Sequence, residues 1–503
     1  MEFVHRENEW VVNMEKLMRE DQGAGDAAEE AKQWLKQSVY RVPAHIRNTN
    51  TSGSSPYGPH LVSLGPFHHG SPDLAAMEVH KQRALLHLLR RTGRPFRGLV
   101  AALGEVAQKL REAYKDLDPK WVEGNGEESF LKMMLLDGCF LLEVMRTAAE
   151  AEEEEEKKPA PEQEQDGVGG GELCDYAAND PIFSRHGELY MFPYVRRDML
   201  VIENQLPLLV LQRLLAFLHG ASAAVRISGN PVPSFELYPE LNCGHEQTDD
   251  AINNMVLDFV KMTPNPPAIR GGGLALHPLD VCHRSLLHGP PRPLRTGPLD
   301  EFVPSATELD QAGVRFKPSR TRSLHDIRFH RGALHIPAFA VDDATEHKLL
   351  SLMAFEQLHA TNDRHASNEV TAYVFFMDNV IKSAADARLL SAVGVVWNGL
   401  GSDKAVAEMF NRLANEAVLD RRSGLHDVHR AVNAYRDTRW HEWRASLVQN
   451  HAGNPWAIIS LVVAFILLVL TVVQTVYTVL PYHDQQQQQS AGGGGGGGLI
   501  QEL

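Results

Sequence analysis

An apolar segment toward the end of the sequence constrains the fold more than any other feature. From Trp456 to Leu480 the chain contains no Asp, Glu, Lys or Arg. At about 1.5 Å per residue, a helix of this length would exceed the roughly 30 Å hydrocarbon core of a bilayer. Pro455 suits a first helical turn, and Trp456 and Tyr477 lie where interfacial aromatic side chains are favoured. We therefore predict a transmembrane helix from Trp456 to Leu480, with a buried core helix as the alternative.

The few polar residues inside this segment do not oppose the prediction. They are Thr471, Gln474, Thr475 and Thr478. A threonine hydroxyl can donate a hydrogen bond to a carbonyl one turn earlier in its own helix, so it need not stay unpaired in lipid. We expect the threonines to bond in this way.

Basic residues flank only the N-terminal side of the segment. Arg436, Arg439 and Arg444 lie within about 20 residues before it, which is the distance over which flanking charge sets orientation. No Lys or Arg follows it. The start of the chain lacks the uninterrupted apolar core of a secretory signal peptide. We therefore expect a single-pass protein of the plasma membrane, with a cytosolic N-terminal body and the lipid bilayer as a partner.

Charge and cysteine content exclude several functional classes. The 503 residues carry a formal net charge of −15, which argues against nucleic-acid binding because that depends on basic surface to replace phosphate counterions. The four cysteines are scattered without CxxC spacing, so neither a disulfide framework nor a cysteine-based zinc site is indicated. We expect unidentified protein partners, no nucleic acid and no cofactor.

Changes in composition divide the chain into six segments. The stretch 150–172 is acidic and rich in Gly, and it cannot bury enough apolar surface to order itself, so we predict a disordered loop there. The Gln- and Gly-rich tail is similarly of low complexity. The predicted segments are a helical lead-in (1–38), an N-terminal helical part of the body (39–149), the acidic loop (150–172), a C-terminal part of the body (173–450), the transmembrane helix (456–480) and the tail (481–503).

The fold class is predicted to be mainly α, with a helical globular body and one small β element near 313–341. Alternating patterns appear there, and His330 to Ala333 supply a turn between two short strands. His325, His330 and His335 recur every five residues. Odd steps along one strand point to opposite faces, so these side chains converge only if the turn rearranges them.

The same region contains the only dense run of basic residues. Phe316 and Phe329 are interleaved with Arg315, Lys317, Arg320, Arg322 and Arg328. Such a run could contact phosphates or an acidic partner. The charged edge of a solvated hairpin is the simpler interpretation, because exposed strands commonly carry such residues.

One histidine constellation has spacing that could suit a metal ion. His277, Asp280 and His283 follow at three-residue steps, which place them loosely on one helical face. Pro278 interrupts this set and no fourth ligand is evident, so a helix start at this point is the preferred interpretation. The patterns HExxH, GxSxG and GxxxxGK[ST] are absent, and we predict no catalytic residues.

The phrase from Glu203 to Pro207, "ENQLP", could suggest a binding site. We instead expect its polar side chains to satisfy backbone groups freed by Pro207, which interrupts a helix.

Several phrases together resemble the plant DUF247 (UPF0481) family. They include "VYRVPAHIR", "YGPHLVSLGPFHHG", "RRDMLVIENQLPLLVL", "LHDIRFHRGALHIPAFAVDDATEHKLLSLMAFEQ" and the apolar segment itself, in an order that extends from about Val39 to Leu480. The resemblance implies a plant protein with a C-terminal membrane helix. It implies no catalytic residues, since no enzymatic activity is established for the family as a whole. Some grass members are implicated in pollen–stigma self-incompatibility as male specificity determinants.

The leading hypothesis is a membrane-anchored, non-enzymatic plant recognition or signalling protein, with pollen self-incompatibility in a grass as its specific form. Surface segments 150–172 and 220–300 would carry specificity, because loops vary without disturbing the core. The alternatives are a metal-dependent enzyme that uses the histidine-rich loops and a structural membrane adaptor.

Overall fold

The computed structural model describes residues 16, 32–47, 56–157, 176–219, 245–260, 269–289, 295–296, 302–359, 368–415, 422–437, 459–460 and 462–477. The chain divides into two units. The first comprises 1–307 and 315–432, and the second comprises 308–314 and 433–503. Of the predicted lead-in 1–38, the structure describes residue 16 and residues 32–38, of which 32–36 are helical, and the tail 481–503 lies outside the described residues.

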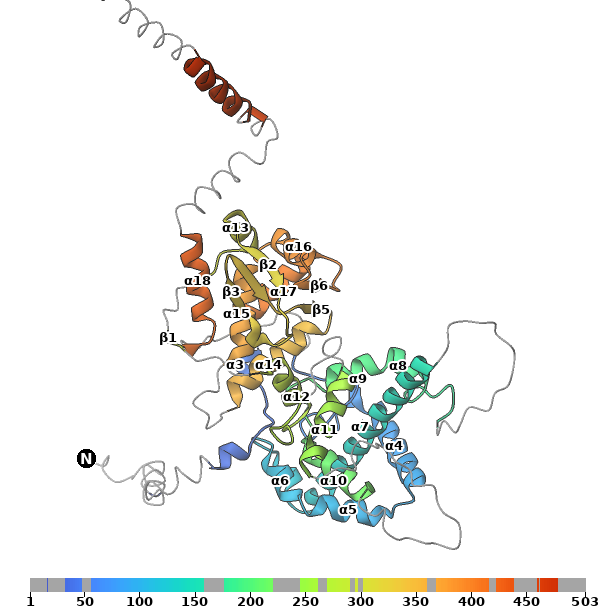
Figure 1. The fold of residues 1–503 in the computed structure, drawn as a ribbon. Coiled ribbons are helices and arrows are strands. Elements are labelled where there is room, and N and C mark those ends of the chain that lie inside the picture. Colours follow the sequence, from blue (N-terminus) through green and yellow to red (C-terminus); the bar gives the residue numbers. More distant parts are fainter. Residues whose placement is uncertain are drawn as a thin grey trace, which may run out of the picture. The chain divides into compact units, whose positions relative to one another are not determined.

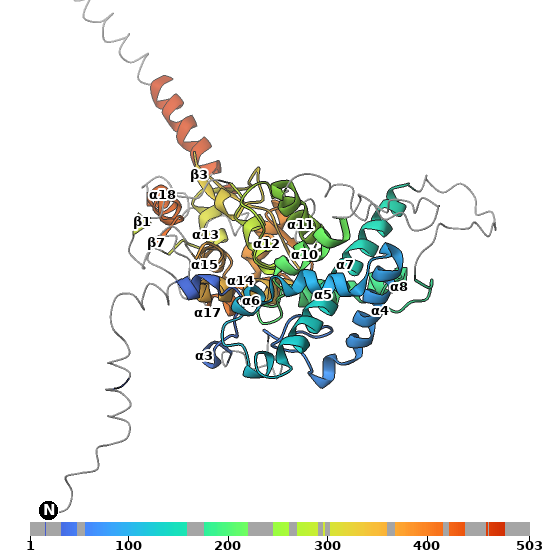
Figure 2. The same ribbon diagram turned by 90° about the horizontal axis from the view of Figure 1, so that it is seen from below.

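The first unit begins with helices packed around one long central helix. Its elements up to the middle of the chain are α3 (Ala44–Arg47), η1 (Pro72–Leu74), α4 (Ala76–Thr92), α5 (Phe96–Gly104), α6 (Ala107–Glu112), η2 (Pro119–Trp121), α7 (Gly126–Lys157), α8 (Arg185–Tyr190), α9 (Phe192–Asp198), α10 (Leu208–His219), α11 (His245–Val260) and α12 (Pro278–Leu286). Helix α7 packs against α4, α5, α10 and α11, as Figures 1 and 2 show. It supplies an almost unbroken apolar core in which Phe130, Phe140 and Leu141 are completely buried.

Helix α7 also corrects one prediction. We expected a disordered loop from residue 150, but the helix continues to Lys157. Ala, Glu and Lys all favour helix, and the Arg146 guanidinium pairs with the Glu150 carboxylate one turn later at 2.5 Å. Residues 158–172 of the predicted loop lie outside the described residues.

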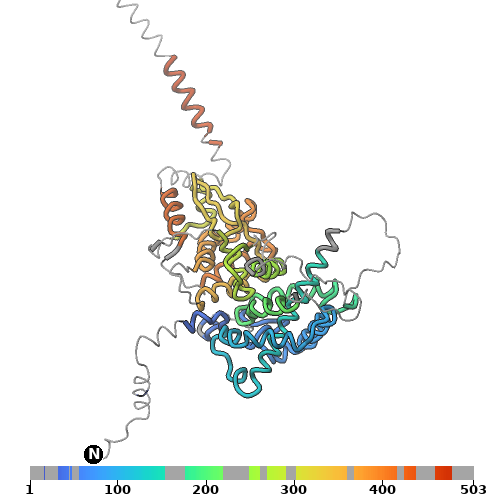
Figure 3. Tube along the Cα trace, turned by 60° about the horizontal axis from the view of Figure 1, so that its bottom comes forward, coloured from blue at the N-terminus to red at the C-terminus, as the bar shows by residue number. Residues whose placement is uncertain are grey.

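The later part of the first unit mixes short strands with helices. Its elements, together with α13 and α18, which both extend into the second unit, are β1 (Arg295–Thr296), α13 (Ala306–Gln311), β2 (Arg315–Pro318), η4 (Leu324–Asp326), β3 (Arg328–His330), β4 (Ala333–Ile336), β5 (Phe339–Val341), α14 (Thr345–Leu358), α15 (Glu369–Val380), α16 (Ala384–Ala392), β6 (Val396–Asn398), α17 (Asp403–Asn415), β7 (Arg422–Ser423) and α18 (His426–Arg436). The described chain is thus mainly helical, as predicted, but its strands form three small sheets, and β1, β6 and β7 lie outside the single β element predicted near 313–341. Figure 3 shows this yellow and orange part beside the blue and green helices.

The largest sheet has three strands in the order β2-β4-β3. The predicted hairpin is confirmed, because β3 pairs antiparallel with β4 and His330 lies opposite Ala333. Both turn residues have positive φ, 49° at Arg331 and 71° at Gly332. This geometry matches the right-handed twist of the flanking strands. Strand β2 pairs parallel with β4, and two further two-stranded sheets join β5 to β6 and β1 to β7.

The side chains of the ENQLP segment hold distant backbone as well as the backbone of the turn before it. Asn204 donates its side-chain amide to the carbonyls of Val62 and Asp198, both at 3.0 Å, and accepts from the Leu64 amide at 2.7 Å. Glu203 accepts from the Val42 amide at 2.6 Å. Gln205 donates its side-chain amide to the carbonyls of Met199 and Val201 at 2.8 and 2.6 Å. Buried polar bonds to the preceding turn are therefore present as expected, and the segment has further partners more than a hundred residues earlier in the chain.

The second unit contains the predicted transmembrane segment in part. Helical residues are described at 459–460 and 462–477, and 456–458, 461 and 478–480 lie outside the described residues. Within the described residues, no helix is both long and apolar enough to cross a membrane. The predicted threonine bonds are confirmed for Thr471 and Thr475, whose hydroxyls donate to Leu467 and Thr471 carbonyls at 2.7 Å.

Candidate functional site

The loop between residues 56 and 71 is held in place by several buried polar side chains. The Asp198 carboxylate accepts three consecutive backbone amides of this loop, from His60, Leu61 and Val62, at 2.6–2.9 Å. Asn204 holds Leu64 as described above. Pro-rich loops cannot form a regular ladder of backbone bonds, so these buried side chains take the place of a neighbouring strand.

Gly65 fixes the middle of this loop. Its φ is +72°, and an added Cβ would lie 2.7 Å from the Tyr114 hydroxyl and 2.8 Å from the Gln205 carbonyl oxygen. Its amide donates to the Asp137 carboxylate at 2.8 Å. Only glycine combines this backbone conformation with so little space.

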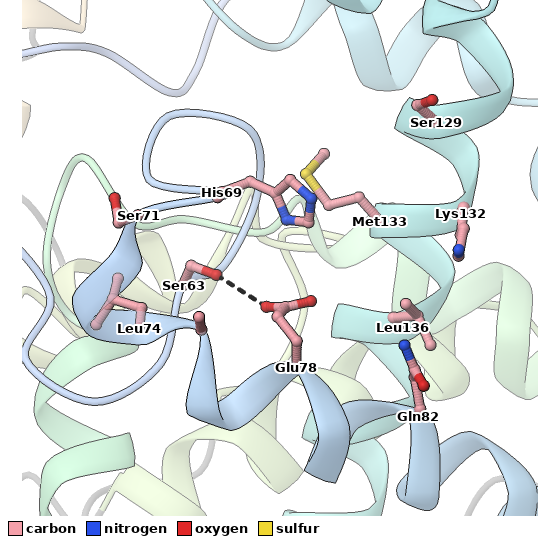
Figure 4. Close-up of a pocket in the computed structure, with 12 residues that line it drawn as sticks. Ser63, His69, Ser71, Leu74, Glu78, Gln82, Ser129, Lys132, Met133 and Leu136 are labelled. Atoms are coloured by element: carbon pink, nitrogen blue, oxygen red, sulfur yellow. Dashed lines mark hydrogen bonds between the residues drawn. The ribbon is translucent and has the colours of Figure 1, made fainter.

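A pocket of about 330 Å³ lies between this loop, α4 and α7, and Figure 4 shows the side chains around it. The residues that give it chemical character are polar or sulfur-bearing. They are Ser63, His69 and Ser71 from the loop, Glu78 and Gln82 from α4, and Ser129, Lys132 and Met133 from α7.

A buried lysine organises the wall of the pocket. The Lys81 ammonium is fully buried and lies 2.7 Å from Asp137 and 2.6 Å from Glu78. It also donates to the Ser63 carbonyl at 2.7 Å. Burial alone would lower the pKa of Lys81, but the Asp137 and Glu78 carboxylates outweigh burial and raise it. Lys81 is therefore a permanent cation.

Glu78 connects this buried cluster to the open pocket. Its side chain is 27% exposed, whereas Lys81 and Asp137 have almost no exposed surface. One carboxylate oxygen accepts from Lys81 and from the Ser63 hydroxyl, the latter at 3.3 Å. Figure 4 shows the other oxygen on the side of the pocket lined by Leu136. The site thus offers a fixed negative group to a small polar ligand.

His69 faces Glu78 across the pocket (Figure 4). Its ring packs edge-to-face against Trp121, with the ring centroids 5.5 Å apart. Its Nδ1 atom is buried and has no hydrogen-bond partner among the described residues. Buried polar atoms are normally paired, so an open nitrogen at a pocket wall suits a ligand that supplies the missing partner.

The proposed metal ligands are not brought together as ligands. His277 is the N-cap of α12, where its Nδ1 accepts from the Asp280 amide at 3.2 Å, and Pro278 occupies the first turn. Asp280 pairs with Arg284 at 2.8 Å, and His283 lies 3.1 Å from the Glu356 carboxylate. In the described parts of the chain, no three or more His, Cys, Asp or Glu side chains are grouped to hold a metal ion. The helix-start interpretation is confirmed.

The pocket residues were missed in the sequence because they lie in separate segments. The loop and α4 meet α7 only after the helices pack, and no motif joins Ser63 or His69 to Lys132. The available signal was indirect. A charged Lys81 lies among the apolar positions of α4, and Asp137 lies inside the apolar run of α7, so two buried opposite charges require each other.

Comparison with known proteins assigns the chain to a family. A family described as a plant protein of unknown function, DUF247, matches residues 39–470. The chain belongs to the DUF247 family. Among relatives in Arabidopsis thaliana, UPF0481 protein At3g47200 is 26% identical over 459 residues, which cover 88% of this chain and 86% of that protein. Putative UPF0481 protein At3g02645 is 25% identical over 548 residues, which cover 93% of this chain and 94% of that protein. No solved structure matches the chain.

The DUF247 match covers the ENQLP segment and the three elements that line the pocket, which are the 56–71 loop, α4 and α7. The polar contacts that hold the 56–71 loop therefore all lie within the region that this family shares. The family is described as being of unknown function, so the function is argued from the residues.

Proposed function

We propose that this DUF247 protein is a membrane-anchored recognition protein whose cytosolic body binds a small polar ligand without transforming it. The observation that carries the anchor is the uncovered apolar surface of the 462–477 helix. Its large apolar side chains are between 44% exposed, at Val469, and 74% exposed, at Tyr477. A helix that is apolar all round is stable only when buried in protein or lipid.

The absence of charge along this helix supports lipid rather than protein as its cover. The threonine hydroxyls are paired inside the helix, so no polar group demands an external partner at those positions. The arginines before the segment favour a cytosolic body, and we propose the plasma membrane as its location.

Alkaline carbonate extraction of plant membranes that contain the full chain tests the anchor. The wild-type chain should stay in the pellet, and Leu468→Arg with Val472→Arg should release it, since each central arginine costs about 2.5–3.5 kcal/mol of insertion. The control variant, Val79→Arg with Phe302→Arg, places the same charges on exposed body positions and should remain in the pellet. Release of the wild-type chain would refute anchoring.

Tags at the two ends test the orientation. Protease added to intact cells should remove a C-terminal tag and leave an N-terminal tag intact. The reverse pattern would place the body outside the cell and overturn the cytosolic assignment.

Recognition is supported by the pocket beside Glu78. Its carboxylate is already neutralised on one side by Lys81, which suits a fixed binding contact better than a group that must exchange protons during a reaction. His69 Nδ1 provides a second open contact. Glu78→Gln should abolish capture of small-molecule ligands from plant extract, detected by mass spectrometry of the purified chain, whereas Glu105→Gln on the surface should not. Identical ligand profiles for wild type and Glu78→Gln would refute this role.

The specific form of this proposal is a determinant of pollen self-incompatibility in a grass. The expectation that 220–300 is surface loop was wrong for α11 and α12, whose side chains include buried core residues, and residues 150–157 belong to α7. Exchange of residues 158–172 and 220–244 between two alleles should therefore transfer the specificity of pollen rejection. Unchanged rejection would remove these segments from recognition.

A further inference from the structure

One face of the three-stranded sheet is formed almost wholly of basic side chains. The strand pairing places Arg315, Ala333 and His330 in one cross-strand row, and Lys317, His335 and Arg328 in the next. Residues paired across strands, and residues two apart along a strand, point to the same face. The only member of this basic face that is neither Arg, Lys nor His is the small Ala333.

Burial shows that this is the outer face. Phe316 and Leu334, which lie between the two rows, are 6% and 0% exposed and belong to the core. Arg315, Lys317, Arg328 and His330 are exposed, and His335 is half-buried. The hairpin turn therefore brings His330 and His335 to the same face of the sheet. Without the turn, their spacing of five residues would place them on opposite faces.

The positive charges on this face are poorly compensated. Arg328 pairs with Asp326 at 2.7 Å. Among the residues that the structure describes, no carboxylate lies within ion-pair distance of Arg315, Lys317 or the nearby Arg320. Like charges that face each other across strands repel, so the bare face is destabilising by itself. On a chain with a net charge of −15, such a concentration indicates a place for an anion.

A cavity of about 930 Å³ adjoins the basic face. Arg320, Arg328, His330 and His335 line it on the side of the sheet, and Asp427 and Val428 line it on the other side. Asp427 is held by Arg430 at 2.9 Å, so its charge is partly compensated. The described residues of the cavity wall therefore supply positive charge and hydrogen-bond donors, and the cavity has space for a bound molecule.

The dimensions select the shape of the anion. Adjacent strands lie about 4.8 Å apart and alternate residues about 6.8 Å apart, so the basic groups cover a patch of roughly 10 by 7 Å. An extended acidic peptide would present carboxylates along one line and meet few of these groups. Several phosphates on one small ring would meet them together, and arginine side chains bind phosphate through paired donors.

We infer that the basic face binds a compact, soluble, multiply phosphorylated small molecule. The site is distinct from the pocket beside Glu78 and does not depend on the membrane anchor. Its ligand class is set by the two rows of basic residues and by the adjoining cavity, which Arg328, His330 and His335 line.

Calorimetric titration of the full chain in non-ionic detergent with inositol hexakisphosphate tests this inference. We expect saturable one-to-one binding that weakens strongly as salt is raised, because exposed charges are screened. Lys317→Gln with Arg328→Gln should weaken binding at least about tenfold, and Arg315→Gln should weaken it less. Arg90→Gln with Lys109→Gln removes the same charge from exposed helical positions and should leave affinity unchanged.

Three results would overturn the inference. They are an absence of saturable binding by the wild-type chain, equal weakening in the basic-face and control variants, and charge-dependent binding only to phosphatidylcholine vesicles that contain phosphatidylserine. The last result would assign the face to a membrane surface instead. Unchanged circular dichroism in Arg315→Gln would separate loss of binding from loss of folding. Anchoring is measured independently, so failure of either proposal leaves the other standing.

Discussion

His277 should make the stability of the body depend on pH in a way that one substitution removes. Its ring is completely buried, with Nδ1 accepting from the Asp280 amide and Nε2 lying 3.0 Å from the Ser38 carbonyl. A carbonyl can only accept and an amide N–H can only donate, so the ring is the neutral tautomer with its proton on Nε2. A second proton would have to occupy Nδ1 and break the cap of α12.

The sign and size of the effect follow from the pKa of His277. Burial is the main cause that lowers this pKa from 6.5 to about 4. His277 therefore takes up a proton near pH 6.5 in the unfolded chain but only near pH 4 in the folded chain. The free energy of unfolding consequently decreases as the pH falls from about 6.5 to about 4. The loss amounts to about 1.8 kcal/mol between pH 7 and pH 5, and to about 3 kcal/mol in total.

The matched variant is His277→Asn, because asparagine keeps a side-chain acceptor at the N-cap but does not titrate. Urea unfolding of wild type and variant, followed by tryptophan fluorescence at pH 7 and pH 5, gives the difference in unfolding free energy at each pH. The advantage of the wild type should shrink by about 1.8 kcal/mol at pH 5. Other histidines contribute equally to both chains and cancel. An advantage that is the same at both pH values would refute the buried, neutral imidazole.

Three further substitutions test the polar contacts that hold the fold. Lys81→Met should cost about 3–5 kcal/mol of unfolding free energy, because it leaves the buried Asp137 carboxylate without its partner. Adding Asp137→Leu should recover part of that loss in a double-mutant cycle. A double variant less stable than Lys81→Met would contradict this. Asn204→Ala removes bonds to three backbone groups and should cost at least about 3 kcal/mol by urea unfolding, whereas Asn411→Ala, on an exposed helical face, should change stability by less than about 0.5 kcal/mol. Ser383→Ala breaks the capping box with Asp386 at the start of α16 and should lower the free energy of unfolding by about 1 kcal/mol. If the free energy does not change, the hydrogen bond from Thr307 is sufficient to hold Asp386.

Local features were predictable from the sequence, and distant pairings were not. The hairpin turn at Arg331 and Gly332 and the helix start at Pro278 depend on adjacent residues, so their chemistry is visible in the sequence. The parallel pairing of β2 with β4 joins segments separated by a loop and a hairpin strand, and nothing in either strand specifies it.

The ENQLP segment shows the same limit on a larger scale. Its buried polar side chains were expected, but Glu203 and Asn204 reach Val42, Val62 and Leu64 in addition to the neighbouring turn at Asp198. A single sequence reveals that a polar group will need a buried partner, yet many backbone groups can fill that need. The continuation of α7 past residue 150 was missed for the opposite reason, since overall composition outweighed the local helix propensity of Ala and Glu.

Topology and ligand chemistry bear on each other in this protein. The pocket beside Glu78 and the basic face both lie in the body, which the arginines before residue 456 are expected to retain in the cytosol. Both would then meet intracellular ligands. Residues 481–503 follow the apolar segment and consist largely of Gln and Gly, which offer few side chains for specific recognition outside the cell. A role in recognition between cells therefore requires either a partner that carries the signal across the membrane or an orientation opposite to the one the charges favour. The tag experiment decides between these two, and an exposed N-terminal tag would place the pocket itself in contact with the neighbouring cell.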